Sequence, residues 1–292
     1  MPPRRVPAVL SIAGSDSGGG AGVQADLKAF AACGVHGMTA ITALTAQNTV
    51  GVTGVHPVPP AFIVEQVRAV QDDLGVDAVK IGMLGTTGIV AAVREALDLL
   101  EPGTPVVIDP VMVSESGSVL LDEAAREALV RLLLPRATVI TPNVPEAVVL
   151  ARTGGVGRPE DVARRADQGP DPEDLARRLH TLGPANVIVT GGHREQVTDV
   201  LFDGDRIVEL PGDRHPDGAA HGSGCTHSSA LAAHLALGFG VEEAARRAKA
   251  VAAAAVRDGL RDLGAGAGPV NALGVAGESA SRAETLSAAA VA

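Results

Sequence analysis

A cysteine stands between a glycine-rich turn and an alanine-rich helical stretch near the C-terminal end of the chain. The segment reads GAAHGSGCTHSSALAAHLA, residues 218–236, and the cysteine is Cys225. Gly222, Ser223 and Gly224 precede it and place backbone N–H groups of a helix N-terminus where an anion would collect. A thiol at such a position is expected to have a lowered pKa and to act as a base or nucleophile. The alternative is a buried cysteine that only packs a tight turn.

Oxygen-bearing side chains follow three other apolar runs. Asp109 stands in IDPVM, Asn143 and Glu146 stand in TPNVPEA, and Thr190 and Gly192 belong to the tight turn TGGH. Mg²⁺ takes oxygen ligands and often shares them with phosphates. Each residue alone could be a helix cap or a turn residue. Together with the anion-binding turn and a neighbouring base, they predict phosphoryl transfer at a metal–phosphate site.

A glycine-rich stretch, AGSDSGGGAGVQAD (residues 13–26), follows the first apolar run. Its exposed N–H groups would suit an anion or a polar ring, although a merely flexible turn is an equal alternative. No Lys-Ser/Thr pair follows, so it is not a Walker A loop. The relaxed dinucleotide fingerprint at residues 20–25 has no acidic partner about 20 residues further on, so that match is weak.

Three more side chains are candidates for a role at the site. Gln47 carries an amide that can read the edge of a heteroaromatic ring through one donor and one acceptor, although capping a loop is equally compatible with the sequence. Met83, in KIGML, is either core filler or a surface for a flat ring. Lys80, one of only three lysines, is expected to pair with a nearby carboxylate.

Short apolar runs alternate with helical patterns along most of the chain. Strands are predicted at residues 6–14, 37–46, 78–84, 105–112, 137–143 and 186–192. Continuous apolar runs are typical of a parallel sheet covered on both faces, and repeated βα units predict a doubly wound α/β fold. Ligands of such sheets bind beyond the carboxyl ends of the strands, which is where the polar residues above would meet.

Some segments depart from this rhythm. Residues 197–210, with Asp203-Gly204 at the turn, predict an antiparallel hairpin at one edge of the sheet. Residues 153–172 are rich in Gly, Pro and charge and predict a mobile insertion. Residues 272–292 have no core pattern and predict a disordered tail, which leaves a single domain over residues 1–271.

Composition excludes several classes of function. The 292-residue chain has a net charge of −10, four Phe, no Tyr and no Trp, so neither a basic face nor stacking side chains are available for nucleic acid. No apolar stretch reaches the roughly 20 residues of a membrane helix, and no signal-peptide cleavage pattern is evident. The two cysteines, Cys33 and Cys225, are expected to be reduced thiols of a cytoplasmic protein.

The motifs AGSDSGGGAGVQADLKAF, ITALTAQNT, KIGML, DPVM, TPNVPEA, GGH and AHGSGCTHSSALAA occur in the order found in bacterial hydroxymethylpyrimidine/phosphomethylpyrimidine kinases. The chain resembles that family over roughly residues 8–271. The resemblance implies a ribokinase-like fold and the use of Mg-ATP in thiamine biosynthesis. The enzymes phosphorylate 4-amino-5-hydroxymethyl-2-methylpyrimidine and then add a second phosphate. Relatives are commonly dimers, so the resemblance also implies a homodimer.

The resemblance assigns roles to individual residues. It implies that Gln47 reads the aminopyrimidine edge, that Gly14 and Asp26 frame the pocket, and that Met83 and Val111 pack on the ring. It further implies that Asn143 and Glu146 serve Mg²⁺ and the phosphates, with Asp109 near the nucleotide. The GSGC turn resembles the anion hole and the catalytic residue, with Cys225 where sugar kinases of the superfamily carry an aspartate.

The chain departs from the family pattern at two places, and two alternative functions stay open. Many relatives read KGGH where this chain has Thr190, which leaves the relative strength of the two phosphorylations open, and the insertion at 153–172 is longer than the family leads us to expect. A pyridoxal or pyridoxine kinase is the alternative enzyme, because that branch shares the fold. A non-catalytic pyrimidine-binding regulatory protein is the alternative from another class. The intact cysteine, amide and glutamate favour catalysis.

Overall fold

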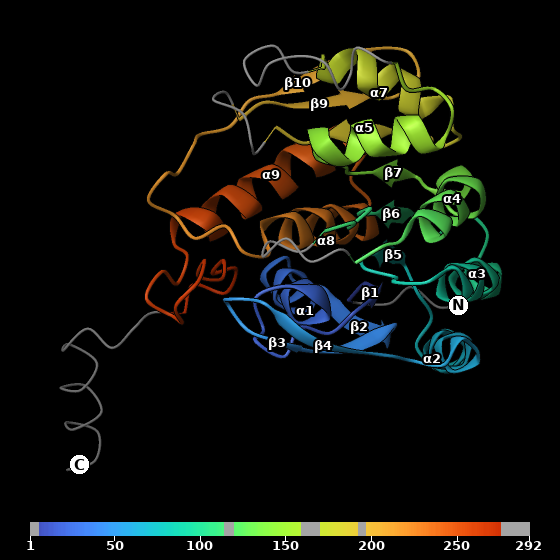
Figure 1. Ribbon diagram of the computed structural model, residues 1–292, viewed down its shortest axis with the longest axis horizontal. Coiled ribbons are helices and arrows are strands. Elements are labelled where there is room, and N and C mark those ends of the chain that lie inside the picture. The colour runs from blue at the N-terminus through green and yellow to red at the C-terminus, as the bar shows by residue number, and fades with distance from the viewer. Residues whose placement is uncertain (1–5, 114–119, 159–169, 192–196, 276–292) are drawn as a thin grey trace.

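A computed structural model describes residues 6–113, 120–158, 170–191 and 197–275. Its centre is an eight-stranded sheet in the order β10-β9-β8-β7-β6-β5-β1-β2 (Figure 1). The strands are β1 (Ala8–Ala13), β2 (His36–Ile41), β5 (Ala78–Ile81), β6 (Val106–Ile108), β7 (Val139–Ile140), β8 (Val187–Val189), β9 (Asp199–Phe202) and β10 (Ile207–Leu210). The six strands from β2 to β8 run parallel.

Helices cover both faces of this sheet, which explains the continuous apolar strands. One face packs against α1 (Gly22–Ala32), α8 (Ser223–Ala236) and α9 (Val241–Arg257). The other packs against α2 (Pro60–Asp73), α3 (Thr87–Ala96), α4 (Glu123–Leu132), α5 (Val144–Thr153) and α7 (Pro172–His180). Figure 1 shows α8 and α9 together on one side and α3 and α4 on the other. Short 3₁₀ turns, η1 (Leu97–Leu99) and η2 (Leu134–Arg136), extend α3 and α4. The doubly wound α/β prediction is confirmed.

The predicted edge hairpin is present. β9 pairs antiparallel with both β8 and β10, and Asp203 accepts hydrogen bonds from the N–H groups of Asp205 and Arg206 at the turn. Arg206 also forms an ion pair of 2.7 Å with Glu242 on α9. The turn residues and this contact fix the edge of the sheet beside the last helix.

The prediction of a single strand over residues 37–46 is wrong, because this range contains two strands. β2 ends at Ile41, and β3 (Ala43–Gln47) leaves the main sheet to pair with β4 (Val52–Pro57) in a separate antiparallel sheet. The chain turns at buried Thr42, whose N–H donates to Ala13 and whose hydroxyl donates to the carbonyl of Met83. Both strands are apolar, so hydrophobicity alone does not reveal the break between them.

The predicted insertion and tail lie partly outside the described residues, at 159–169 and 276–292. Arg158, within the described part of the insertion, forms an ion pair of 3.1 Å with Asp174 on α7. At the start of the tail, Val275 exchanges two hydrogen bonds with Asn271, the last residue of the predicted domain. No helix among the described residues is long and apolar enough to cross a membrane.

Candidate active site

A cavity of about 540 Å³ opens where the parallel strands end. It is lined by residues that follow β1, β5, β6, β7 and β8 and by the first turn of α8. Thirteen of the residues that the sequence singles out line it: Gly14, Gln47, Lys80, Met83, Asp109, Val111, Asn143, Glu146, Thr190, Gly222, Ser223, Gly224 and Cys225. Asp26 does not line the cavity, and Gly192 lies outside the described residues. The expected convergence at the strand ends is therefore present.

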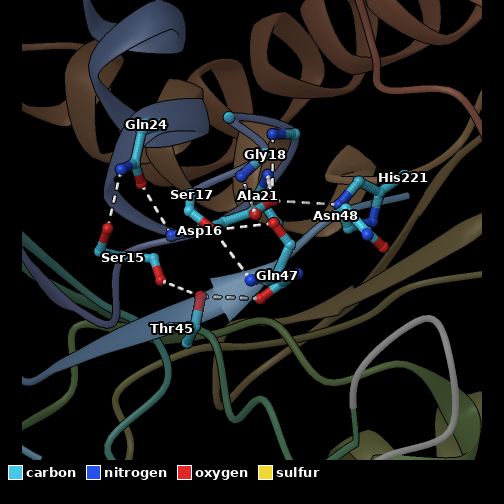
Figure 2. Close-up of polar contacts among 12 residues, drawn as sticks. Ser15, Asp16, Ser17, Gly18, Ala21, Gln24, Thr45, Gln47, Asn48 and His221 are labelled. Atoms are coloured by element: carbon cyan, nitrogen blue, oxygen red, sulfur yellow. Dashed lines mark hydrogen bonds and ion pairs between the residues drawn. The ribbon is translucent and has the colours of Figure 1, made fainter. Parts of the chain in front are cut away.

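The glycine loop, residues 14–22, does not offer its N–H groups to a ligand as the sequence suggested. The carboxylate of Asp16 accepts hydrogen bonds from the N–H groups of Gly18 (2.8 Å), Gly20 (3.0 Å) and Ala21 (2.8 Å), as Figure 2 shows in part. The N–H of Asp16 itself donates to the side chain of Gln24. The prediction of an anion-binding loop is wrong because an internal carboxylate takes these donors.

The glycines of this loop instead allow it to touch the turn before α8. Gly222 has a φ of +87°, and a Cβ atom there would lie 1.8 Å from the carbonyl oxygen of Gly20. Nε2 of His221 lies 3.2 Å from Asp16. Burial alone would raise the pKa of Asp16, but hydrogen bonds from His221 and from the loop N–H groups lower it below its ordinary value. The two loops are thus held together by a charged carboxylate.

A buried ion pair forms the floor of the cavity, which Lys80 lines and Asp26 supports from below. Nζ of Lys80 is 2.9 Å from Oδ1 of Asp26, and neither side chain is exposed to solvent. The hydroxyls of Ser11 and Ser229 donate to the same carboxylate at 2.6 and 2.7 Å. Burial alone would lower the pKa of Lys80, but the charge of Asp26 raises it above its ordinary value. The expected carboxylate partner of Lys80 is confirmed, and Asp26 supports the floor of the pocket rather than its wall.

Cys225 lies in the first turn of α8 and is half-buried. Burial raises the pKa of its thiol to about 12, the charges of Asp26 and Asp109 raise it further, and Lys80 lowers it. The N–H group of Gly22 donates to the sulfur. The predicted lowered pKa is wrong for the chain alone, because the low-dielectric floor and two carboxylates outweigh the helix N-terminus. Without a ligand the thiol is protonated at neutral pH.

Two carboxyl groups line one wall of the cavity. Asp109 is 5 % exposed and accepts a hydrogen bond of 3.0 Å from the hydroxyl of Ser228. Burial raises the pKa of Asp109, and burial together with the charge of Asp109 raises the pKa of Glu146 to about 8. Such a wall is short of positive charge. A divalent cation would supply that charge.

Asn143 and Glu146 also form a reciprocal cap at the start of α5. The amide oxygen of Asn143 accepts the N–H of Glu146 at 2.9 Å, and the carboxylate of Glu146 accepts the N–H of Asn143 at 3.0 Å. This is the capping-box arrangement, which fixes both side chains at the carboxyl end of β7. The capping role and the cavity position therefore coexist.

Gln47 ends β3 at a bulge and is held by its backbone. Its N–H donates to Ser17 at 2.8 Å and its carbonyl accepts the hydroxyl of the same serine (Figure 2). The amide oxygen lies 3.3 Å from the hydroxyl of Thr45, and no hydrogen bond from the amide NH₂ is recorded. Opposite, Met83 lies against Gly14, where a Cβ atom would be 2.9 Å from its methyl carbon. An amide beside a thioether suits a flat polar ring.

Several cavity residues were not predicted from the sequence, among them Asp199, His227 and Lys249. Asp199 begins β9, and the other two project from α8 and α9. Their signals were weak, because His227 lies in an otherwise helical alanine-rich pattern and Lys249 belongs to an arginine-bearing helix. Only the scarcity of lysine in this chain pointed to Lys249.

Comparison with known proteins shows a family. The family model described as phosphomethylpyrimidine kinase matches residues 16–271. A hydroxymethylpyrimidine/phosphomethylpyrimidine kinase of Rhizobium meliloti is 45 % identical over 90 % of this chain and 95 % of its own length. The thiamine biosynthesis bifunctional protein ThiED of Geobacter sulfurreducens is 44 % identical over 92 % of this chain, which spans 53 % of that longer protein.

Solved structures show the same fold. A pyridoxal kinase from Staphylococcus aureus in complex with ADP superposes with a TM-score of 0.79 at 34 % identity, over 92 % of this chain and 94 % of that one. A phosphomethylpyrimidine kinase from Clostridium difficile gives 0.69 at 38 % identity, over 84 % and 96 %. These are ribokinase-like proteins, so the cavity lies in a fold that binds nucleotides in its relatives.

Proposed function

The chain belongs to the phosphomethylpyrimidine kinase family, and we propose that it uses ATP to phosphorylate 4-amino-5-hydroxymethyl-2-methylpyrimidine and then the resulting monophosphate, in thiamine biosynthesis. The observation that carries the proposal is one cavity that holds the amide of Gln47, the carboxyl wall and the first turn of α8. Phosphoryl transfer to an alcohol on a ring needs an amide that recognises the ring, carboxyl groups that bind a cation, and a helix N-terminus that binds an anion.

The pyrimidine occupies the end of the cavity between Gln47 and Met83. The amide of Gln47 reads the polar edge of the ring through its donor and its acceptor. Met83 and Val111 supply apolar surface for the ring faces, while Gly14 leaves room for a close approach. Asp26 acts from below by holding Lys80.

Mg²⁺ fits the wall formed by Asp109, Asn143 and Glu146. Among the described residues no cluster of three or more His, Cys, Asp or Glu could hold a metal alone. Mg²⁺ commonly uses only one or two carboxylates together with substrate phosphates. The carboxyl groups of Asp109 and Glu146, whose pKa values are raised, are therefore enough. When bound, the ion offsets the negative charge of the phosphate oxygens during transfer. Thr190 lines the same cavity and is assigned to the nucleotide. Gly192, assigned the same role from the sequence, lies outside the described residues.

Cys225 takes the proton from the substrate's hydroxyl group, and the N–H groups of Gly222 and Gly224 face the transferred phosphoryl group. The N–H of Ser223, which the sequence also assigned to this role, donates instead to the carbonyl of Ala220 at 3.0 Å. In the ligand-free chain burial, together with the charges of Asp26 and Asp109, keeps the thiol protonated. Lys80 lowers the pKa of the thiol and is the neighbouring cation that favours its ionisation.

A pyridoxal kinase activity is the second candidate. The S. aureus pyridoxal kinase superposes at a higher TM-score than the C. difficile phosphomethylpyrimidine kinase, 0.79 against 0.69. The test is ATP consumption with the pyrimidine alcohol, its monophosphate and pyridoxine side by side. We expect both pyrimidines to be turned over faster than pyridoxine. Preference for pyridoxine would favour the second candidate, and no turnover of any of them would favour a regulatory binding protein.

We further propose a cytoplasmic homodimer. Both cysteines are free thiols, as expected in a reducing compartment. The small sheet exposes Leu44 (47 %) and Val55 (50 %), apolar side chains that a second subunit would cover. Sedimentation should give twice the chain mass, and Leu44→Lys with Val55→Lys should shift it toward the monomer.

A further inference from the structure

A polar cluster in the same cavity has no part in the mechanism above. Nζ of Lys249 lies 2.8 Å from Oδ1 of Asp199, and Nε2 of His227 lies 3.9 Å from Oδ2 of the same carboxylate. The three residues are 8 %, 4 % and 6 % exposed for Lys249, Asp199 and His227 respectively, and all line the cavity. Three buried polar side chains from α9, β9 and α8 thus converge on one wall.

His227 has a buried ring nitrogen without a partner. Nε2 makes no hydrogen bond, because its nearest charged neighbour is beyond hydrogen-bonding reach. Buried polar atoms in folded proteins are almost always paired, with protein or with a bound group. Burial lowers the pKa of His227, Asp199 opposes that effect and Lys249 reinforces it. A neutral imidazole facing a cavity is suited to a hydrogen bond from or to a ligand.

Lys249 is held in position but retains donor capacity. The carboxylate of Asp199 accepts one of its three N–H bonds and also accepts the N–H of Gly191 at 2.9 Å. The stem of the lysine is covered by bare backbone, since a Cβ atom at Gly212 would lie 2.4 Å from its Cε. Asp199 therefore points Lys249 and leaves its other N–H groups for the cavity.

The surroundings identify the kind of ligand. Apolar residues line the same cavity: Val197, Pro216, Ala252, Ala253 and Val256. Ala252 and Ala253 stand one turn after Lys249 on α9. Such a wall suits a flat purine. Thr190 is neutral and Lys80 is locked to Asp26. Arg214 also lines the cavity, from the exposed loop before α8, whereas Lys249 is buried and held in place. Among the described residues Lys249 is therefore the preorganised buried cation for a phosphate beside the purine.

We propose that Lys249 and His227 bind a phosphate group of the nucleotide, with Asp199 as the residue that positions Lys249. This inference rests on the proposed function, because it concerns the ATP site of the same reaction. It also supplies positive charge at the nucleotide end of a site that carries threonine at position 190.

The test compares the binding of ADP and of adenosine, each without pyrimidine, by calorimetry and competition. Lys249→Met should weaken ADP about ten- to a hundredfold and adenosine less than about twofold, as loss of a charged hydrogen bond predicts. Lys249→Arg should restore most of the affinity. The matched control is Arg246→Met, one turn earlier on α9, where the arginine pairs with Glu242 outside the cavity. That control should bind ADP like the wild type.

The contribution of His227 is tested with one variant of its own and one control variant. His227→Leu should weaken ADP about three- to tenfold. His234→Leu, another buried histidine on α8, whose ring bonds the carbonyl of Ala230, should leave ADP binding unchanged once its fold is verified by circular dichroism. Lys249→Met leaves the buried carboxylate of Asp199 without its partner and could prevent folding. In that case the double variant Asp199→Asn, Lys249→Met is used for the same measurement.

The outcomes separate the two proposals. Wild-type affinity for ADP in folded Lys249→Met, or equal weakening of ADP and adenosine, overturns the phosphate contact while leaving the kinase assignment intact. Failure of the wild-type chain to bind ADP at all overturns the proposed function and this inference with it. Selective loss of ADP binding supports the contact.

Discussion

Cation binding at Glu146 should release a proton at neutral pH. Burial and the nearby charge of Asp109 raise the pKa of Glu146 to about 8, from an ordinary value of 4.5. With that pKa, the fraction of protonated carboxyl is about 0.9 at pH 7, about 0.5 at pH 8 and about 0.1 at pH 9. A carboxylate must be ionised to bind a metal ion. Proton release per bound ion should therefore fall from about 0.9 to about 0.1 between pH 7 and pH 9.

The sign for affinity follows from the raised pKa. Below about pH 8 the proton competes with the cation, so affinity should weaken by up to about tenfold per pH unit as the pH falls, and it should level off above that pH. Calorimetric titration with Mn²⁺ in two buffers of different ionisation enthalpy counts the protons. Glu146→Gln keeps an oxygen for the capping box and should remove the proton that Glu146 releases. Glu127→Gln, which alters an exposed carboxylate on α4, is the control. Release below about 0.3 at pH 7, or equal release in both variants, would refute the reasoning.

Three further outcomes are expected. Gln47→Ala should weaken pyrimidine binding by about 1–3 kcal/mol and leave ADP binding unchanged in calorimetry, because only the ring edge loses its partner. Alkylation of Cys225 in the ligand-free chain, followed by mass spectrometry, should be slow at pH 7 and rise only above about pH 10. A midpoint near pH 8 would contradict the buried setting of the thiol. Asp26→Ala should cost about 3–5 kcal/mol in urea unfolding by stranding Lys80, while Asp98→Ala in an exposed pair should cost less than about 1 kcal/mol.

Much of the fold could be predicted from the sequence because its signals are local. Continuous apolar runs marked the parallel strands, and Asp203-Gly204 marked the edge hairpin. The split of the second strand was not predictable in this way, since the chain turns at Thr42 through hydrogen bonds to Ala13 and Met83, which are remote in sequence. Apolar character is similar on both sides of that turn.

The candidate site was predictable in membership but not in electrostatics. Residues at strand ends converge by topology alone, so Gln47, Asp109 and Glu146 could be named in advance. The pKa of Cys225 depends on burial and on Asp26 and Asp109, groups that are distant in the chain. The prediction for the glycine loop failed for a different reason: the acceptor of its N–H groups is Asp16, within the loop itself, and the sequence does not show that these hydrogen bonds close internally.

The turnover number of Cys225→Ala tests the central claim most directly. If the thiol takes the proton of the hydroxymethyl group, kcat should fall about 10²–10⁴-fold. The pyrimidine and Mg-ATP should still bind, because the N–H groups of the turn belong to the backbone. Cys225→Ser should resemble the alanine variant, and Cys225→Asp should recover part of the rate. Near-normal turnover of Cys225→Ala would contradict the account and leave Cys225 as a packing residue.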